Sequence, residues 1–203
     1  MIVDIHPETP QARKIAQVVE LLKNDGLIIM PTGTSYVFGC AISSKQAMKR
    51  IYQIKEMEKN QPLTFICSDT RQFEQYTKGI PNPVFRKIRS LLPGPYTFIF
   101  QASKLIPKTL LSPRATIGVK MPNSPIALSL AEAMNEPIVT SSVPLDPEQE
   151  YFIPWYLEEE YGNQVDLIVD GGEVFISESS IVDFSHESPQ IIRQGTGNLD
   201  WLE

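Results

Sequence analysis

The chain has 203 residues, of which 42% are hydrophobic and 21% are charged, and its formal net charge is −6. This composition is typical of a soluble globular protein that can bury a substantial core. It contains no apolar run near the roughly 18 residues of a membrane helix. The N-terminus, with Asp4 and Glu8, lacks the basic start and apolar middle of a signal peptide. We therefore expect a cytoplasmic protein with no membrane partner.

The few cysteines and histidines argue against metal and hydrolase chemistry. Cys40 and Cys67 lie far apart in apolar segments, which predicts reduced core thiols rather than a disulfide or a metal pair. His6 and His186 have no metal-ligand spacing, so neither a zinc site nor a Ser-His-Asp hydrolase is expected. The sequence predicts no metal site.

Charged residues are segregated along the chain. Basic side chains gather at Lys45, Lys49, Arg50, Lys55 and Lys59, and acidic ones gather within 146–160. The net charge argues against a uniformly basic nucleic-acid binder, but segregated charges can still form one basic surface. A solvated helix face is the alternative interpretation of both groups.

Helices and strands alternate from end to end without repeats, which predicts an α/β fold. An amphipathic helix is expected to start at Thr9-Pro10 and to stop at Asp25-Gly26. Strands over 27–30 and 36–42 follow, and then a helix capped by Ser43 or Ser44 that runs through Ile54. Lys55 falls at or just beyond its end, where a cation also interacts favourably with the helix dipole.

The remaining elements continue this alternation. The stretch 146–161 is acidic and aromatic and is expected to form a surface loop and helix. Further strands are predicted over 63–67, 96–100, 116–120, 137–140, 166–169, 180–184 and 190–193, and further helices over 83–92 and 124–135.

The segment Pro31-Thr32-Gly33-Thr34-Ser35-Tyr36 follows directly on a short apolar strand. Ligands of open α/β sheets tend to bind beyond such strand ends, and hydroxyls and backbone N–H groups can hold small polar ligands. Ser, Thr and Gly after a strand are also ordinary turn residues. Both interpretations stay open for this loop.

Hydroxyl pairs recur at several strand ends. They are Thr32 with Thr34, Ser141 with Ser142, and Ser179 with Ser180. Together with Lys55, Lys120 and Arg193 they could converge in a cleft suited to phosphate and carboxylate groups. Because neither a phosphate-binding loop nor a dinucleotide fingerprint is present, a nucleotide would be held by a different arrangement.

The ordered set of landmarks resembles the family named after the YrdC and YciO proteins. The similar segments span 26–195. They are Pro31 to Tyr36, Lys55 followed by Pro62-Leu63, Pro93 to Thr97, Thr116 to Pro122, Thr140 to Ser142, Ser179 to Asp183, and Ile192 to Gly195. The resemblance implies a single α/β domain over 1–203, a twisted mixed sheet with helices packed around a large concave cavity.

The resemblance also implies a function. Members of this family make threonylcarbamoyl-adenylate from ATP, threonine and bicarbonate, with Mg²⁺, for the t6A modification of tRNA, and they are also described as binding double-stranded RNA. Carried over to this chain, Thr32, Thr34, Tyr36 and Lys120 would contact the amino acid. Lys55, Ser141, Ser180 and Arg193 would face the nucleotide and its phosphates, and Lys55 and Thr32 are the candidate catalytic residues.

The chain departs from the family pattern at four positions. The pattern Lys-x-Arg ends in Met57, the pattern Ser-x-Asn ends in Val143, Gly33 replaces an acidic residue, and Lys120 replaces an arginine. Methionine and valine cannot make the hydrogen bonds of arginine and asparagine. If each lost contact is worth about 2–3 kcal/mol in the transition state, catalysis slows about a thousandfold. The pattern resembles the YciO branch.

Three functional hypotheses follow. The first is a threonylcarbamoyl-AMP synthase, weakened or acting on a related acceptor. The second is a protein that binds double-stranded RNA or tRNA without synthase activity. In the third, purely structural hypothesis, the hydroxyls serve only turns and caps.

Overall fold

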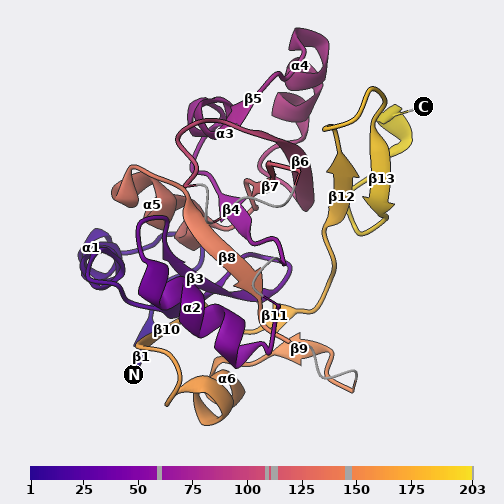
Figure 1. Cartoon of the computed structure of the whole chain (residues 1–203). Helices are drawn as coiled ribbons and strands as arrows, with labels where there is room; N and C mark the ends of the chain where they lie inside the picture. Colours follow the sequence, from indigo (N-terminus) through magenta and orange to yellow (C-terminus); the bar gives the residue numbers. More distant parts are fainter. Residues whose placement is uncertain (59–60, 108–109, 111–113, 145–147, 203) are drawn as a thin grey trace.

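The computed structural model is shown in Figure 1. It describes residues 1–58, 61–107, 110, 114–144 and 148–202. Lys59 and Asp146, which belong to the basic and acidic groups of the sequence, lie outside the described residues.

Eleven strands form one mixed sheet, in the order β1-β10-β2-β3-β8-β4-β7-β6-β12-β13, with β5 paired to β6. Two further short strands, β9 and β11, pair with each other. The strands are β1 (Ile2–Asp4), β2 (Ile28–Pro31), β3 (Tyr36–Ala41), β4 (Thr64–Ile66), β5 (Thr77–Lys78), β6 (Tyr96–Ala102), β7 (Thr116–Lys120), β8 (Ile138–Ser142), β9 (Tyr151–Phe152), β10 (Leu167–Asp170), β11 (Val174–Phe175), β12 (Ser180–Asp183) and β13 (Gln190–Arg193). The predicted mixed α/β fold is confirmed.

Within the described residues, six α-helices connect and cover the strands (Figure 1). They are α1 (Ala12–Lys23), α2 (Lys45–Ile54), α3 (Thr70–Tyr76), α4 (Asn82–Leu91), α5 (Pro125–Met134) and α6 (Pro154–Tyr161), and a 3₁₀ turn η2 (Asp200–Leu202) follows β13. In the part of the chain that the structure describes, no helix is long and apolar enough to cross a bilayer.

Alternation along β2 divides the core into two layers. Successive side chains of a strand point to opposite faces. Ile28 and Met30 therefore pack with the buried stripes of α1 and α5. Ile29 packs on the other face, with side chains of α2, α6 and the aromatic cluster around Phe98. Because all four residues of β2 are buried, the loop that follows it is anchored on a rigid strand.

Most predicted elements are present, with boundaries shifted by one or two residues. The first helix is present, but its predicted start was wrong: it begins at Ala12, after Gln11. The hydroxyl and the N–H of Thr9 are hydrogen-bonded to the ring of His6, so Thr9 does not cap the helix. The expected surface helix is α6, but it also buries Leu157 and Tyr161. Among the described residues, six elements had no prediction: β1, α3, β5, β9, β11 and η2.

Cys40 and Cys67 are free and fully buried. Burial raises the pKa of both thiols, so thiolate chemistry is suppressed. Their prediction as reduced core residues is confirmed.

Candidate functional site

The loop after β2 is held in a fixed shape by its own polar groups. Thr32 is buried, and both its N–H and its hydroxyl donate to the carbonyl of Ser35, at 2.8 and 2.9 Å. Gly33 has φ +81°, and a Cβ there would lie 2.7 Å from the carbonyl oxygen of Asn123. Glycine therefore stands at position 33 for a conformational reason, since an acidic side chain would be strained there.

Strand register brings two cations of the candidate site together. Lys120 of β7 pairs with Thr97 of β6, Thr97 pairs with Ile181 of β12, and Ile181 pairs with Arg193 of β13. Lys120 and Arg193 thus lie in one row across four neighbouring strands, although they are far apart in the sequence. Opposed hydrophobic strands specify this register.

Lys120 is a buried cation without a counter-charge. Its side chain has 8% relative exposure, and among the described residues its ammonium forms no hydrogen bond or ion pair. Burial, and to a smaller degree the charge of Arg193, lowers the pKa of Lys120 to about 8. Removal from water without compensation disfavours the charged form, so the site is electrostatically incomplete and suited to an anion.

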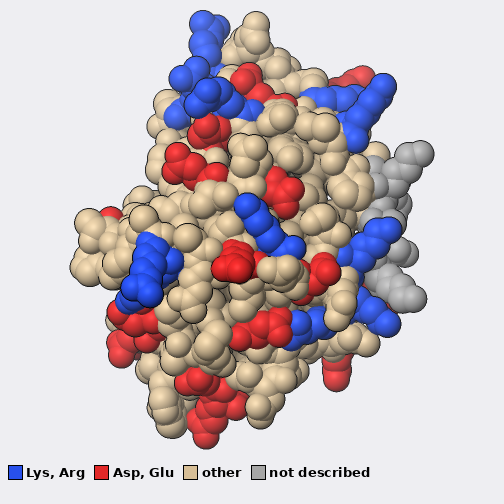
Figure 2. Space-filling model, turned by 90° about the vertical axis from the view of Figure 1, so that its left-hand side faces the viewer, with Lys and Arg blue, Asp and Glu red and all other residues tan. Residues whose placement is uncertain are grey.

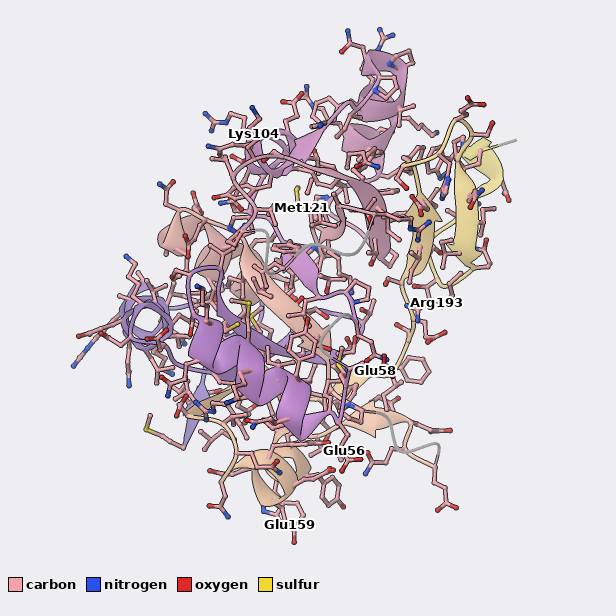
Figure 3. The ribbon with its side chains drawn as sticks, in the orientation of Figure 1. Glu56, Glu58, Lys104, Met121, Glu159 and Arg193 are labelled. Carbon is pink, nitrogen blue, oxygen red and sulfur yellow. The ribbon has the colours of Figure 1, made fainter. Side chains whose placement is uncertain are left out.

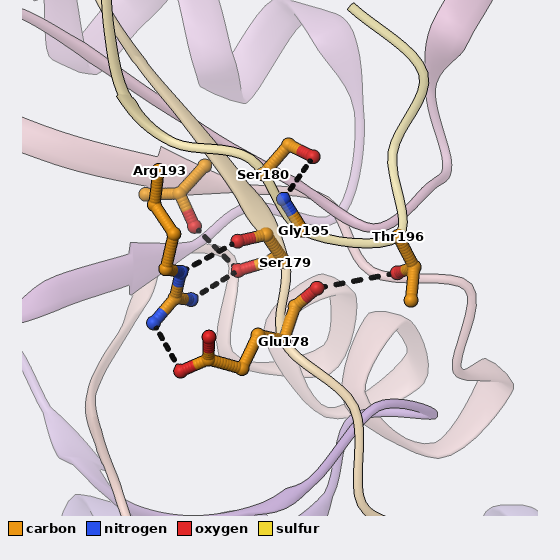
Figure 4. Close-up of polar contacts among 7 residues, drawn as sticks. Glu178, Ser179, Ser180, Arg193, Gly195 and Thr196 are labelled. Atoms are coloured by element: carbon orange, nitrogen blue, oxygen red, sulfur yellow. Dashed lines mark hydrogen bonds and ion pairs between the residues drawn. The ribbon is translucent and has the colours of Figure 1, made fainter.

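Arg193 is held by the segment that precedes β12 (Figure 4). Its Nε donates to the carbonyl of Ser179 at 3.0 Å, and its Nη1 donates to the carboxylate of Glu178 at 2.8 Å. The hydroxyl of Ser179 lies 3.2 Å from that of Thr97. The guanidinium is therefore fixed in orientation and already paired with one carboxylate.

Lys55 reaches the site from the end of α2. As predicted, it follows the last helical residue, Ile54. Its Nζ donates to the hydroxyl of Ser141 at 2.7 Å and to the carbonyl of Ser142 at 2.6 Å. Burial lowers its pKa, and both partners are neutral, so Lys55 can still compensate an anionic ligand.

These groups line two adjoining pockets. One, of about 220 Å³, is lined by Thr34, Ser35, Lys55, Lys120, Ser142, Val143, Ser177, Glu178, Ser179 and Arg193. The other, of about 280 Å³, is lined by Thr32, Gly33, Thr34, Gly94, Pro95, Lys120, Pro122, Asn123, Ser177, Ser179 and Thr196. Lys120 lines both pockets. The N–H of Ser177 donates to the carbonyl of Thr34 at 3.0 Å and connects the two sides.

Thr32, Thr34, Lys55, Lys120 and Arg193 thus line the pockets, and Ser141 touches the site through Lys55. Two other predicted site residues lie elsewhere. The phenol of Tyr36 donates to the carbonyl of Gly172 at 2.7 Å and accepts from the N–H of Gly171 at 3.1 Å. Tyr36 and Ser180 are fully buried, and neither lines either pocket.

Ser180 has a structural role in the described fold. Its hydroxyl donates to the carbonyl of Gly197 at 2.6 Å and accepts from the N–H of Gly195 at 3.0 Å. Both bonds close the chain after β13 onto the start of β12, and Figure 4 shows the one that Gly195 donates. With these partners the hydroxyl is satisfied and is not turned toward the pockets.

Sequence reasoning missed Glu178, Ser177, Asn123 and Thr196 as lining residues. Glu178 is the most consequential omission, because its carboxylate faces Arg193. Its position directly before the pair Ser179-Ser180 was the available signal, but nothing in the sequence alone indicates that β12 and β13 pair. Within the described ranges, no group of three or more His, Cys, Asp or Glu could hold a metal ion.

The basic group around α2 does not form one continuous surface. Arg50 donates to the carboxylate of Asp166 at 2.6 Å, and Lys55 points to Ser141. Lys45 and Lys49 are exposed. The expected basic helix face is therefore reduced, in the described part of the chain, to these two lysines.

Comparison with known proteins identifies the class to which this fold and site belong. The Sua5, YciO and YrdC family model, described as "Telomere recombination", matches residues 20–195. The chain belongs to this family.

Two relatives match over almost their whole length. An uncharacterized protein of Haemophilus influenzae is 40% identical over 198 residues, which is 96% of this chain and 95% of the relative. YciO of Escherichia coli is 36% identical over the same coverage. Its crystal structure superposes with a TM-score of 0.91 and covers 98% of both chains.

Synthases of the family are more distant. Threonylcarbamoyl-AMP synthase of Pyrococcus abyssi is 28% identical over 94% of this chain, which spans 56% of that protein. The crystal structure of P. abyssi Sua5 complexed with L-threonine matches with a TM-score of 0.86 at 27% identity, over 96% of this chain and 57% of that one. The resemblance to the YciO branch is thus confirmed.

Proposed function

We propose that this protein binds ATP and threonine in the two adjoining pockets and makes threonylcarbamoyl-adenylate slowly. One observation supports the proposal above all: Lys120 is a buried, unpaired cation on the wall shared by the two pockets. An isolated buried charge is costly, so a cation kept there is best explained by an anionic ligand. Phosphate and carboxylate groups of an adenylate and an amino acid meet that requirement.

The proposed reaction follows from the groups available. Bicarbonate and the amino group of threonine form a carbamate with the loss of water. A carbamate oxygen attacks the α-phosphorus of ATP, and the bond to the departing pyrophosphate breaks. Negative charge develops on phosphoryl oxygens, which Lys55, Lys120 and Arg193 stabilise together with Mg²⁺ bound to ATP. Thr32 and Thr34 hold the amino acid. No covalent enzyme intermediate is required.

A low rate follows from two side chains near Lys55. The Sδ of Met57 lies 3.8 Å from the hydroxyl of Ser141, and Val143 lines the smaller pocket. Neither side chain can donate a hydrogen bond to a phosphoryl oxygen. The neighbours of Lys55 therefore offer fewer charge-stabilising contacts than the arginine and asparagine of the family pattern would.

The test is pyrophosphate release at high enzyme concentration, with ATP, threonine and bicarbonate all present. We expect slow turnover that needs all three substrates and that is lost in Lys55→Ala. Lys104→Ala is the matched control, because Lys104 lies well apart from Arg193 in Figure 3 and lines neither pocket. No turnover with threonine or several other amino acids would overturn the synthase proposal.

Binding is tested separately by thermal shift with ATP, AMP and threonine. A ligand that binds only the folded state raises Tm. A rise with AMP but no turnover would favour a nucleotide-binding protein without synthase activity. If no ligand changes Tm, the clustered hydroxyls serve turns alone.

Binding of RNA is the second candidate function. The charged residues that the structure describes favour it less than nucleotide binding. Binding of tRNA or duplex RNA through phosphates would weaken steeply with salt. Mobility-shift titrations at low salt would reveal such binding. A double variant with Lys45→Gln and Lys49→Gln would bind the RNA more weakly.

A further inference from the structure

One part of the chain is strongly acidic. Residues 121–192 contain no Lys or Arg, and they hold 14 of the 24 acidic residues of the chain. This segment includes β9, α6 and β11, which lie together at the lower end of the molecule in Figure 1. In Figure 2 the lowest part of the visible face carries Asp and Glu without Lys or Arg, whereas both signs of charge are mixed over the rest of that face.

Exposed aromatic side chains lie on the same elements. Tyr151 of β9 and Phe175 of β11 form an edge contact with ring centroids 5.4 Å apart. Trp155 and Tyr156, in the first turn of α6, form another at 4.8 Å. Trp155 is 61% exposed and Phe175 is 58% exposed. Such gathered apolar rings are unfavourable in water and mark interaction surfaces.

Three carboxylates on or beside these elements form no ion pair in the described part of the chain, whereas Glu158 of α6 pairs with the N-terminal ammonium of Met1 at 3.9 Å. The three are Glu150, Glu159 and Glu173, and all of them are exposed. Figure 3 shows Glu159 at the outer side of α6, directed away from the molecule. We call these three carboxylates, together with Tyr151, Trp155, Tyr156 and Phe175, the aromatic–acidic face.

A small pocket beside these rings is also lined by aromatic, aliphatic and acidic side chains. It measures about 200 Å³, and Phe152, Tyr156, Leu157 and Glu160 are among its lining residues. A long aliphatic stem can lie against such an apolar wall, while its cationic head reaches a carboxylate and an aromatic ring. Arginine fits better than lysine, because a planar guanidinium also stacks on rings.

We propose that the aromatic–acidic face binds a protein partner through a basic, arginine-containing segment. Charge complementarity selects this occupant: the three carboxylates of the face form no ion pair in the described part of the chain, and its aromatic rings attract cations. A nucleic acid would be repelled by the same carboxylates. This surface does not include Lys55, Lys120 or Arg193, although Val143 lines both its small pocket and the pocket that holds these cations. Partner binding does not require the proposed reaction.

The probe is fluorescein-labelled hexa-arginine, and labelled hexa-lysine and hexa-glutamate serve for comparison. Binding of each peptide to the protein is measured by fluorescence anisotropy. We expect hexa-arginine to bind several-fold more tightly than hexa-lysine, and hexa-glutamate not to bind. The double variant that carries both Trp155→Ser and Tyr156→Ser should bind hexa-arginine about fivefold more weakly, although its net charge is unchanged. Glu159→Gln with Glu173→Gln should weaken it and reduce its dependence on salt.

The matched control removes exposed apolar side chains from a different strand. Ile191 and Ile192 of β13 are 54% and 55% exposed, and Ile191→Ser with Ile192→Ser should leave hexa-arginine binding unchanged. Equal binding by the wild type and the Trp155/Tyr156 variant would overturn the proposal, because attraction to net charge alone would then suffice. So would self-association in sedimentation velocity that disappears in this variant, since the face would then join two copies of the chain.

Discussion

Lys120 and Arg193 lie in one row of the sheet, separated by Thr97 and Ile181, yet their charges are compensated differently. Arg193 is paired with Glu178 at 2.8 Å, whereas Lys120 has no partner within the described chain and its pKa is lowered to about 8. Of these two cations, Lys120 is therefore the one whose charge is left uncompensated.

Lys120→Met should stabilise the protein at pH 7 and abolish AMP binding. The pKa of Lys120 falls from its ordinary 10.5 to about 8 on folding, which corresponds to a penalty of about 3 kcal/mol for the charged form. Because the folded pKa is the lower one, this penalty is complete below pH 8 and disappears as the pH rises to 10.5. Thermal unfolding at pH 7 should show a Tm increase of about 5–10 °C. A Tm below that of the wild type would contradict the expected stabilisation.

AMP affinity should fall as the pH rises through 8. Above pH 7 the phosphate of AMP is already fully ionised, so the remaining titration in this range belongs to the protein. An anion attracts the protonated ammonium of Lys120, whose pKa is about 8, and not the neutral amine. Isothermal titration from pH 7 to pH 9.5 should show a loss of about tenfold. A flat profile would remove Lys120 from the ligand contacts.

Glu178→Gln should strengthen phosphate binding. The carboxylate of Glu178 now competes with any anion for Arg193, whose orientation is kept by the carbonyl of Ser179. The pair is partly exposed, so its energy is small, and we expect pyrophosphate to bind about three- to tenfold more tightly. Glu74→Gln, on the exposed surface of α3, is the control for lost negative charge. Unchanged binding would show that Arg193 makes no ligand contact.

Met57→Arg combined with Val143→Asn should accelerate pyrophosphate release at least a hundredfold. Both positions adjoin the contacts of Lys55 and Ser141, so the new side chains can reach a phosphoryl oxygen bound there. The measurement compares turnover of the double variant, each single variant and the wild type. If Tm stays near the wild-type value and the rate does not rise, these residues do not limit synthesis.

Ser180→Ala should cost about 1–3 kcal/mol of stability without affecting nucleotide affinity. Its hydroxyl makes two buried hydrogen bonds, to Gly195 and Gly197, and their loss leaves a carbonyl and an N–H without a partner. Denaturant unfolding gives the stability, and AMP titration gives the affinity. A weaker AMP complex in a stably folded variant would restore Ser180 to the nucleotide-binding residues predicted from the sequence.

Elements with clear patterns were predictable from the sequence. The strand over 116–120 was predicted at its observed limits, and Ser44 caps α2 as expected. Short elements such as β5 and β11, of two residues each, contain too few positions for a periodic pattern. They exist because other strands pair with them, β6 with β5 and the equally short β9 with β11, which is a tertiary effect.

The site was only partly predictable for a related reason. Lys55, Lys120 and Arg193 were found because cations near strand and helix ends are conspicuous in a sequence. Tyr36 and Ser180 were assigned to the ligands through the family resemblance, but their hydroxyls bond to backbone groups. Only the three-dimensional pairing decides whether such a hydroxyl serves the fold or a ligand.

The pairing of distant strands has a consequence for how the chain folds. β1 pairs with β10 through Ile2 and Ile168, and β6 pairs with β12 through Tyr96 and Ser180. Each contact closes a long loop before it contributes any stability, so the barrier to folding is largely entropic. We therefore expect the chain to fold slowly, and strand edges to stay unpaired and prone to misassembly until late in folding. This is the kinetic consequence of a binding site assembled from remote parts of one polypeptide.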